Sequence, residues 1–524
     1  MEALDWLVIG VFFLALIGII VWVVRQKQND SADYFLGGRD ATWLAIGASI
    51  FASNIGSEHL IGLAGAGASS GMAMAHWEIQ GWMILILGWV FVPFYSRSMV
   101  YTMPEFLERR YNPQSRTILS VISLVSYVLT KVAVTVYAGG LVFQQVFGIK
   151  ELWGIDFFWI AAIGLVVLTA LYTIFGGMKS VLYTSVLQTP ILLLGSLIIL
   201  VLGFKELGGW DEMMRVCGAV TVNDYGDTMT NLIRSNDDAN FPWLGALIGS
   251  AIIGFWYWCT DQHIVQRVLS GKNEKEARRG TIFGAYLKLL PVFLFLIPGM
   301  IAFALHQKYI GAGGEGFLPM LANGTANADA AFPTLVAKLL PAGVKGLVVC
   351  GILAALMSSL ASLFNSSAML FTIDFYKRFR PETPEKKLVG IGQIATVVIV
   401  ILGILWIPIM RSVGDVLYTY LQDVQSVLAP GIAAAFLLGI CWKRTSAQGG
   451  MWGLIAGMVI GLTRLGAKVY YSNAGEVADS TFKYLFYDMN WLFFCGWMFL
   501  FCIIVVIVVI EVSSYQSIYI SIFD

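Results

Sequence analysis

Ionisable and amide side chains lie inside several of the longest apolar stretches of this sequence. A charged side chain at the centre of a bilayer costs roughly 3 kcal/mol unless it finds a partner or lines a water-filled cavity. One such residue could simply pair two helices, but this many, spread over six apolar stretches, predict a shared polar cavity. The residues are Asn54, Glu58, His59, Glu78, Gln80, Lys131, Lys288, the polar residues between Ser358 and Ser367, Gln422, Asp423 and Gln425.

The mixture of these side chains indicates the chemistry of a ligand. Amide, carboxylate, imidazole and ammonium groups occur with aromatic rings at Trp77, Tyr257, Trp258 and Tyr418. Hydroxyl groups both donate and accept hydrogen bonds, so a hydroxyl-rich neutral ligand suits this set, and an aromatic face can cover the CH side of its ring. An amino-acid site would favour a clamp of opposite charges. An acidic metabolite would favour clustered Arg, which we expect to be absent from these core spans.

Two adjacent serines, Ser358 and Ser359, could bind a cation. A hard cation prefers oxygen ligands, which hydroxyls and carbonyls freed by an unwound turn would provide without a formal negative charge. The alternative is structural, because a serine in a membrane helix commonly bonds the carbonyl four residues before it. The sequence alone leaves both interpretations open.

The composition identifies the medium in which these residues must be positioned. Of the 524 residues, 58% are hydrophobic and 13% are charged, against about 45–50% and about 25% in soluble domains. Most of the chain is therefore expected to lie in lipid. The net charge of zero gives no argument for a nucleic-acid partner, and the six scattered cysteines form no CxxC pair or Cys/His cluster. A disulfide framework and a metal centre of that kind are therefore not expected.

About thirteen apolar stretches are long enough to span a bilayer, which takes about 20 residues. Every second connection between them is basic, which predicts an N-terminus outside and a C-terminal tail inside. The chain is thus expected to be a multi-pass protein of the plasma (bacterial inner) membrane. The expected spans are 5–25, 42–68, 74–96, 117–147, 155–175, 180–204, 242–268, 279–306, 333–375, 388–409, 413–441, 449–467 and 490–511.

Two of these spans carry signs of interruption. The second contains Asn54-Ile55-Gly56 and further glycines, and the seventh contains Gly249 and Gly254 before Trp256-Tyr257-Trp258. An offset of five spans reverses the direction of a helix across the membrane, as an inverted five-helix repeat requires. Paired interrupted helices in two inverted halves indicate the binding site of a transporter. The alternative is that the glycines merely allow helices to pack closely.

At these same places the sequence resembles the sodium/glucose cotransporters of the sodium:solute symporter family. The resemblance extends over about residues 5–465 and implies an all-α membrane fold, a leucine-transporter-like five-plus-five inverted repeat with extra flanking helices. It implies repeats at 42–204 and 242–441, an extracellular loop at 205–241, and flanking segments at 1–41 and 442–524. The matching runs are Ala48 to Ser57, Phe255 to Gln262 followed by Val265-Gln266-Arg267, Ala355 to Ser362, Ala429 to Ile432, and Cys441 to Arg444.

The resemblance also implies roles for individual residues. It assigns a sodium ion (Na+) to the backbone carbonyls of Ala52, Ile55 and Ala355 and the hydroxyls of Ser358 and Ser359. An outer lid is implied at Leu63, Trp77 and Tyr418, and Tyr257 is the implied gate on the cytoplasmic side. The implied substrate contacts are Asn54, His59, Glu78, Tyr257, Trp258, Lys288 and Gln422.

One departure from the family bears on how many ions move. Ser185 stands where members that couple two sodium ions have an Asp, so one sodium per sugar is expected. Gly81 and Gly254 stand where some relatives offer polar side chains, which leaves the choice among hexoses open.

The expected function is import of a glucose- or galactose-type hexose by sodium symport, with the hexose, sodium and the lipid bilayer as partners. No nucleic acid and no obligatory protein partner are expected. The alternatives are another polyol such as myo-inositol, a non-transporting sugar sensor on the same fold, and a polytopic membrane enzyme. The enzyme is the least favoured, because no nucleophile–base pair or metal-ligand cluster is visible in the sequence.

Overall fold

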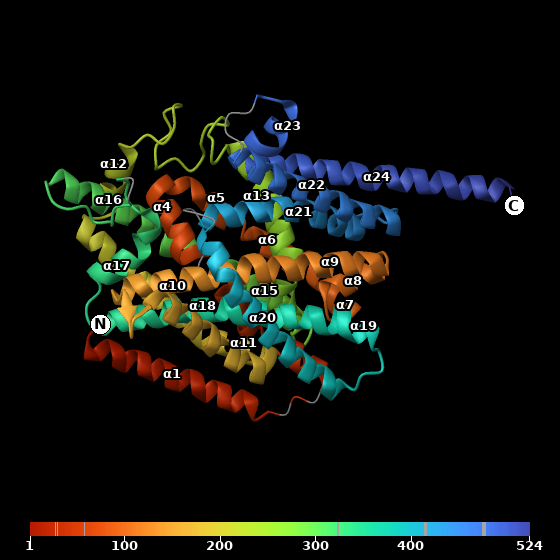
Figure 1. The fold of residues 1–524 in the computed structure, drawn as a ribbon, viewed down its shortest axis with the longest axis horizontal. Helices are drawn as coiled ribbons and strands as arrows, with labels where there is room; N and C mark the ends of the chain where they lie inside the picture. The colour runs from red at the N-terminus through yellow and green to blue at the C-terminus, as the bar shows by residue number, and fades with distance from the viewer. Residues whose placement is uncertain are drawn as a thin grey trace.

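A computed structural model of the chain shows a bundle of helices, with one two-stranded hairpin in the part that it describes (Figure 1). Residues 27, 29, 57, 322–323, 413–416, 474–477 and 524 lie outside the described structure, as do the side chains of residues 129, 409–423, 473 and 513–523.

The first half of the chain supplies α1 to α12 and the hairpin. The elements are α1 (Ala3–Val24), α2 (Ser31–Leu36), α3 (Trp43–Asn54), α4 (Ala64–Ser70), α5 (Ala75–Ile79), α6 (Trp82–Ile86), α7 (Val92–Ser98), α8 (Met103–Arg110), α9 (Pro113–Ser126), α10 (Ala133–Phe147), β1 (Glu151–Leu152), β2 (Ile155–Asp156), α11 (Phe157–Leu207) and α12 (Trp210–Gly218).

The second half supplies α13 to α24. They are α13 (Trp243–Gly254), α14 (Gln262–Leu269), α15 (Glu274–Leu287), α16 (Ile297–Gly311), α17 (Ala331–Leu339), α18 (Val344–Met369), α19 (Lys377–Phe379), α20 (Glu385–Ser412), α21 (Leu417–Cys441), α22 (Ala447–Asn473), α23 (Thr481–Lys483) and α24 (Trp491–Phe523).

Short 3-10 and π-helical turns join several of these helices. The 3-10 turns are η1 (Gly37–Arg39), η3 (Gly71–Met74) and η8 (Ala328–Ala330), and the π-helical turns are η2 (Glu58–Leu63), η4 (Leu87–Phe91), η5 (Tyr127–Val132), η6 (Phe255–Thr260), η7 (Val292–Leu296), η9 (Leu370–Tyr376) and η10 (Tyr484–Asp488).

Eleven helical stretches of the described chain are long and apolar enough to cross a membrane. The stretch Phe157–Leu207 contains two expected spans, because its backbone bends at Gly177, where φ is 54°. The stretch Glu58–Ser98 joins the second half of the second expected span to the third, and Gly71, with φ of 73°, marks the turn between them. These joined stretches account for the difference from the expected number of about thirteen spans.

The second expected span is interrupted as predicted. Helix α3 ends at Asn54, Ile55 is extended with φ of −77° and ψ of 102°, and the chain resumes helical structure in η2 at Glu58. Where a helix ends, its last backbone carbonyls have no partner within the helix and are available to other groups. The break therefore places polar backbone beside whatever packs against Asn54.

The seventh expected span is interrupted later than the glycines suggested. Helix α13 continues through Gly254 into the π-helical turn η6, and the chain becomes extended only at Asp261, with φ of −74° and ψ of 127°. A Cβ atom on Gly254 would lie 2.3 Å from Oε1 of Gln80, and one on Gly249 would lie 2.8 Å from the carbonyl of Leu492. These two glycines therefore serve close packing, and the interruption lies at Phe255–Asp261.

The helices bring the serine-rich part of α18 beside the interrupted second span, because α18 packs against both α11 and α3. The N-terminus lies at the same end of the bundle as α12, α16 and α17, whereas α8 and α19 lie at the opposite end (Figure 1). The basic connections 97–116 and 377–387 thus share one end, and the acidic connection 205–241 lies at the other.

Candidate functional site

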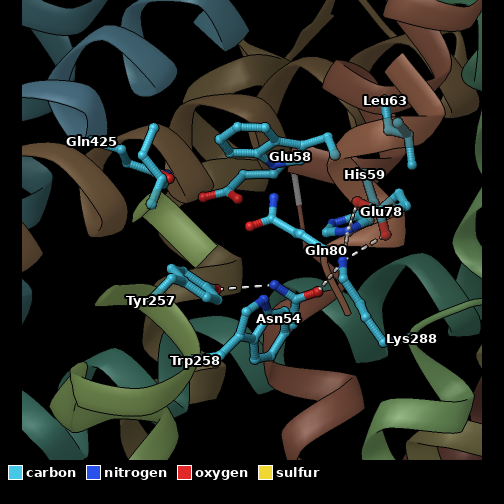
Figure 2. Close-up of a pocket in the computed structure, with 12 residues that line it drawn as sticks. Asn54, Glu58, His59, Leu63, Glu78, Gln80, Tyr257, Trp258, Lys288 and Gln425 are labelled. Atoms are coloured by element: carbon cyan, nitrogen blue, oxygen red, sulfur yellow. Dashed lines mark hydrogen bonds and ion pairs between the residues drawn. The ribbon is translucent and has the colours of Figure 1, made fainter. Parts of the chain in front are cut away.

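The interrupted helices surround a narrow polar cavity, in which the space between atoms, its open mouth included, totals about 400 Å³ (Figure 2). The turn η2, helix α5, the turn η6, the end of α15 and helix α21 each contribute to its wall. The lining residues are Asn54, Glu58, His59, Leu63, Trp77, Glu78, Gln80, Ile253, Tyr257, Trp258, Lys288 and Gln425.

A continuous chain of hydrogen bonds crosses this cavity. The ammonium of Lys288 lies 2.6 Å from Oε2 of Glu78 and donates to Oδ1 of Asn54 at 2.6 Å. Asn54 in turn donates through Nδ2 to the hydroxyl of Tyr257 at 3.0 Å. All four side chains are buried. The chain therefore fixes the amide orientation of Asn54 and ties η6 to the interrupted second span.

His59 joins the same network and is oriented by it. Its Nε2 lies 2.8 Å from Nζ of Lys288 and 3.2 Å from Oε1 of Glu78. An ammonium can only donate, so His59 Nε2 accepts from Lys288 and the hydrogen of a neutral ring lies on Nδ1. That Nδ1 has no hydrogen-bond partner among the described residues. His59 is thus left with a donor for a bound ligand.

The structure gathers nearly all of the residues that the sequence assigned to substrate and lid. Asn54, His59, Glu78, Trp258 and Lys288 line the one cavity with Tyr257, and Leu63 and Trp77 border it as well. The side chains of Gln422 and Tyr418 lie outside the described structure. The individual roles of all these residues remain predictions.

Four lining residues received no role from the sequence. Glu58 and Gln80 stood out as polar residues in apolar stretches, and Gln425 follows the predicted contact Gln422 by about one helical turn. That spacing was a usable signal, since side chains three or four residues apart share a helix face. Ile253 carries no such signal, because it is one apolar residue among many.

Two of the candidate sodium oxygens, the hydroxyl of Ser359 and the carbonyl of Ile55, meet at the break in the second span. The hydroxyl of Ser359 donates to the carbonyl of Ser53 at 2.9 Å and lies 3.4 Å from the carbonyl of Ile55. Its recorded acceptors are therefore carbonyls of the interrupted helix rather than the carbonyl four residues before it. Ala52, Ala355 and Ser358 are buried in the same two helices. Hydroxyl and carbonyl oxygens of this kind suit a hard cation.

Ser185 lies beside the hydroxyl of Ser358, and its own hydroxyl forms a hydrogen bond within its helix. Its hydroxyl donates to the carbonyl of Val181 at 2.6 Å, and it lies 3.2 Å from the hydroxyl of Ser358 and 3.4 Å from that of Ser49. The structural interpretation of membrane serines thus applies to Ser185. No charge is supplied at this position.

Arg267 corrects the expectation that the core spans contain no Arg. It is 1% exposed, and its Nε donates to the hydroxyls of Ser49 at 3.1 Å and Ser53 at 3.0 Å. One terminal nitrogen donates to Ser53 at 2.6 Å and also to Ser362. The sequence suggested a span end near Arg267, where a charge would meet water. Instead every residue of α14 is buried inside the protein.

A second narrow cavity adjoins the first and is lined by Lys131; its space between atoms, open solvent included, totals about 290 Å³. The ammonium of Lys131 lies 2.6 Å from Oδ2 of Asp261 and 4.7 Å from the centre of the Tyr257 ring. Tyr127 donates its hydroxyl to the same Asp261. Lys131 therefore pairs with the extended residue of the seventh span and does not reach the Lys288 network.

Comparison with known proteins identifies the family to which this chain belongs. The sodium:solute symporter family matches residues 34–457. The chain is 38% identical over 479 residues to sodium/myo-inositol cotransporter 2 of Homo sapiens, covering 89% of this chain and 70% of the relative. It is 38% identical over 520 residues to sodium/glucose cotransporter 2 of Rattus norvegicus, covering 95% and 76%.

Solved structures confirm the expected fold. The substrate-bound outward-open structure of a Na+-coupled sialic acid symporter superposes with a TM-score of 0.77 at 22% identity, covering 98% of each chain. The structure of MhsT in complex with L-phenylalanine superposes with a TM-score of 0.54 at 12% identity, covering 90% of this chain and 98% of the other. At such identities the two structures show the fold alone. The chain has the leucine-transporter-like fold and belongs to the sodium:solute symporter family.

Proposed function

We propose that the chain is a secondary active transporter of the plasma (bacterial inner) membrane that imports a hexose together with sodium. The main observation that supports this proposal is that Asn54 lies at both the candidate sodium site and the candidate sugar site. Its side chain bridges Lys288 and Tyr257 in the larger cavity, and it is the last residue of α3, next to the Ile55 carbonyl that faces Ser359. Ion and substrate would therefore share one rigid group.

The larger cavity suits a sugar. His59 Nδ1 supplies a donor, the carboxylates of Glu78 and Glu58 supply acceptors, and Gln80 can do both. The three N–H groups of Lys288 are already directed to Glu78, Asn54 and His59, so this ammonium orients the other groups unless the sugar displaces one of them. Trp258 lies beside Tyr257 in an edge-to-face arrangement with ring centres 4.9 Å apart. Such rings cover the CH face of a sugar and separate it from the side of the second cavity.

Coupling follows from the interrupted helix. Sodium bound at Ser359 and the freed carbonyls holds the second span against α18, which fixes Asn54 and completes the sugar site. Each ligand then shifts the balance between outward- and inward-open states by its differential affinity for them. One charge moving through about 100 mV gains about 2.3 kcal/mol, which supports roughly forty-fold sugar accumulation before the sodium gradient is added.

One sodium per sugar is the proposed stoichiometry. Ser185 brings no negative charge to the hydroxyl cluster, and Arg267 places a guanidinium among the hydroxyls of Ser49, Ser53 and Ser362. A fixed cation repels another cation in a buried site. The cluster therefore leaves room for a cation only on the side of Ser359.

Myo-inositol is the second candidate substrate, because a matching relative is a sodium/myo-inositol cotransporter. Its ring of hydroxyls needs the same donors and acceptors as a hexose. Competition by unlabelled glucose, galactose and myo-inositol against each labelled compound would rank the three.

The deciding experiment is uptake into proteoliposomes that contain the purified protein. We expect labelled glucose or galactose to accumulate only with an inward sodium gradient. Equilibration that is independent of sodium would refute symport, and sodium-dependent binding without accumulation would indicate a sensor. Accumulation also tests whether a protein partner is required, since the liposomes contain none.

The proposed orientation places the N-terminus outside. The basic connections lie at the α8 and α19 end of the bundle, and basic loops face the cytoplasm. An epitope placed before Glu2 should be reached by antibody on intact cells. An epitope reached only after permeabilisation would reverse the orientation.

A further inference from the structure

The two cavities of the site share a wall, and Glu58 is part of it. Asn54, Glu58 and Tyr257 line both the larger cavity and the second one. Glu58 is the first residue of η2, directly after the break in the second span. Figure 2 shows it pointing into the middle of the larger cavity, away from the Lys288 network. Its carboxylate therefore faces the space through which the two cavities meet.

Glu58 differs from the neighbouring acidic residues because no cationic group of the described residues lies in direct contact with it; Lys131 and Lys288 act on it only from a distance. Glu78 is paired with Lys288 at 2.6 Å, and Asp261 is paired with Lys131 at 2.6 Å. No hydrogen bond or ion pair is recorded for Glu58 among the described residues. A carboxylate that is partly withdrawn from water and has no cation in contact with it is only partly compensated, and a mobile cation that binds it directly removes the remaining cost.

The second cavity leads from Glu58 to the candidate sodium oxygens. Ser53, Gly56 and Ser359 line it together with Glu58. On the other side of Ser53 lies the guanidinium of Arg267. A cation at Ser359 therefore has a fixed negative charge on the cavity side and a fixed positive charge beyond it. Lys131 also lines the second cavity, but its charge is balanced by Asp261 at 2.6 Å. The charges of Glu58 and Arg267 therefore attract a cation into the second cavity and stop it before Arg267.

We propose that Glu58 forms an outer cation site that captures sodium in the larger cavity and passes it to Ser359. This inference rests on the proposed sodium symport. Once the ion has moved on, the carboxylate is free to accept a hydroxyl of the arriving sugar. The arrangement makes sodium the first ligand to bind and the sugar the second.

The test is binding of radioactive sodium to the purified protein without sugar, in the wild type and in two variants. Glu58→Gln should raise the half-saturating sodium concentration about tenfold, which corresponds to about 1.4 kcal/mol. Glu58→Asp keeps the charge and should stay within about threefold of the wild type. The exposed Glu151 of β1 provides a matched control, and Glu151→Gln should leave sodium binding unchanged.

Binding without sugar separates this role from a direct sugar contact. Unchanged sodium binding in a folded Glu58→Gln protein would overturn the proposal. If that unchanged sodium binding came with weaker sugar binding at saturating sodium, Glu58 would be assigned to the sugar alone. Equal weakening in Glu58→Asp and Glu58→Gln would also overturn it, because the charge would then not matter. Failure of the wild type to accumulate sugar would refute symport itself and is seen before any variant is made.

Discussion

The buried Lys288–Glu78 pair allows a prediction in which stability and transport separate. The two side chains are 4% and 2% exposed, and their charged atoms lie 2.6 Å apart. Removing one member of such a pair leaves a buried charge without its partner, which costs about 3–5 kcal/mol. Lys288→Met should therefore lower the free energy of unfolding by about that amount, reduced by the hydrogen bond that His59 Nε2, 3.2 Å from Glu78, can donate once it no longer accepts from the ammonium.

The double variant tests the cause. Glu78→Gln together with Lys288→Met removes both charges, and neutral side chains of similar volume often replace a buried pair at little cost. We expect the free energy of unfolding of the double variant to recover to within about 1 kcal/mol of the wild type, although the variant lacks the two charges that are proposed to contact the sugar. The measurements are denaturant unfolding of the purified protein in detergent and sugar uptake into proteoliposomes.

The reasoning would be refuted by either of two results. Full stability of Lys288→Met would mean that Glu78 does not depend on the ammonium. Uptake by the double variant at the wild-type rate would mean that the pair only supports the fold. A stable double variant that binds sodium but no sugar is the expected outcome.

Three further predictions concern other parts of the chain. Ser359→Ala should raise the half-saturating sodium concentration about tenfold or more while sugar binding at saturating sodium changes less, because the hydroxyl reaches carbonyls on both sides of Asn54; equal loss of both would contradict this. Gly177→Ala should lower stability by about 2 kcal/mol or more in thermal unfolding, since φ is 54° and a Cβ would lie 2.4 Å from the carbonyl of Tyr34. Burial raises the pKa of Asp329, in the connection before α17, to about 6 from 3.8. The unfolded chain then ionises first, so stability should fall by up to roughly 3 kcal/mol as pH rises from about 4 to 6, and Asp329→Asn should remove this slope.

Much of the site could be predicted from sequence because lipid makes polar residues conspicuous. Asn54, His59, Glu78 and Lys288 stand out in apolar stretches, and all four line one cavity. The break at Ile55 was predicted for the same reason, since a polar run with glycine interrupts an apolar helix. The contrast with lipid identifies residues that need a polar environment, but it does not say which of them meet.

Arg267 shows where this reasoning fails. A charge near the expected end of a span is ordinarily in water, and nothing local distinguishes an end that turns inward. The burial of α14 depends on packing between segments far apart in the chain, as its contacts with Ser53 and Ser362 show. The prediction of a break at Gly254 was wrong for a related reason. A glycine that makes room for the Gln80 side chain cannot be distinguished in the sequence from a glycine that breaks a helix.

The interrupted helix explains why one residue can serve two ligands. An intact helix would bond the carbonyls near Asn54 internally, and they could not meet Ser359. Ending α3 at this point frees oxygen atoms for a cation and leaves the Asn54 side chain held by Lys288 and Tyr257. In the proposed mechanism, sodium would hold the second span against α18, and it would do so beside the residue that is proposed to orient the sugar site. An interruption elsewhere in the helix could also free oxygens for an ion, but under this proposal the ion would then not be linked through Asn54 to the sugar site.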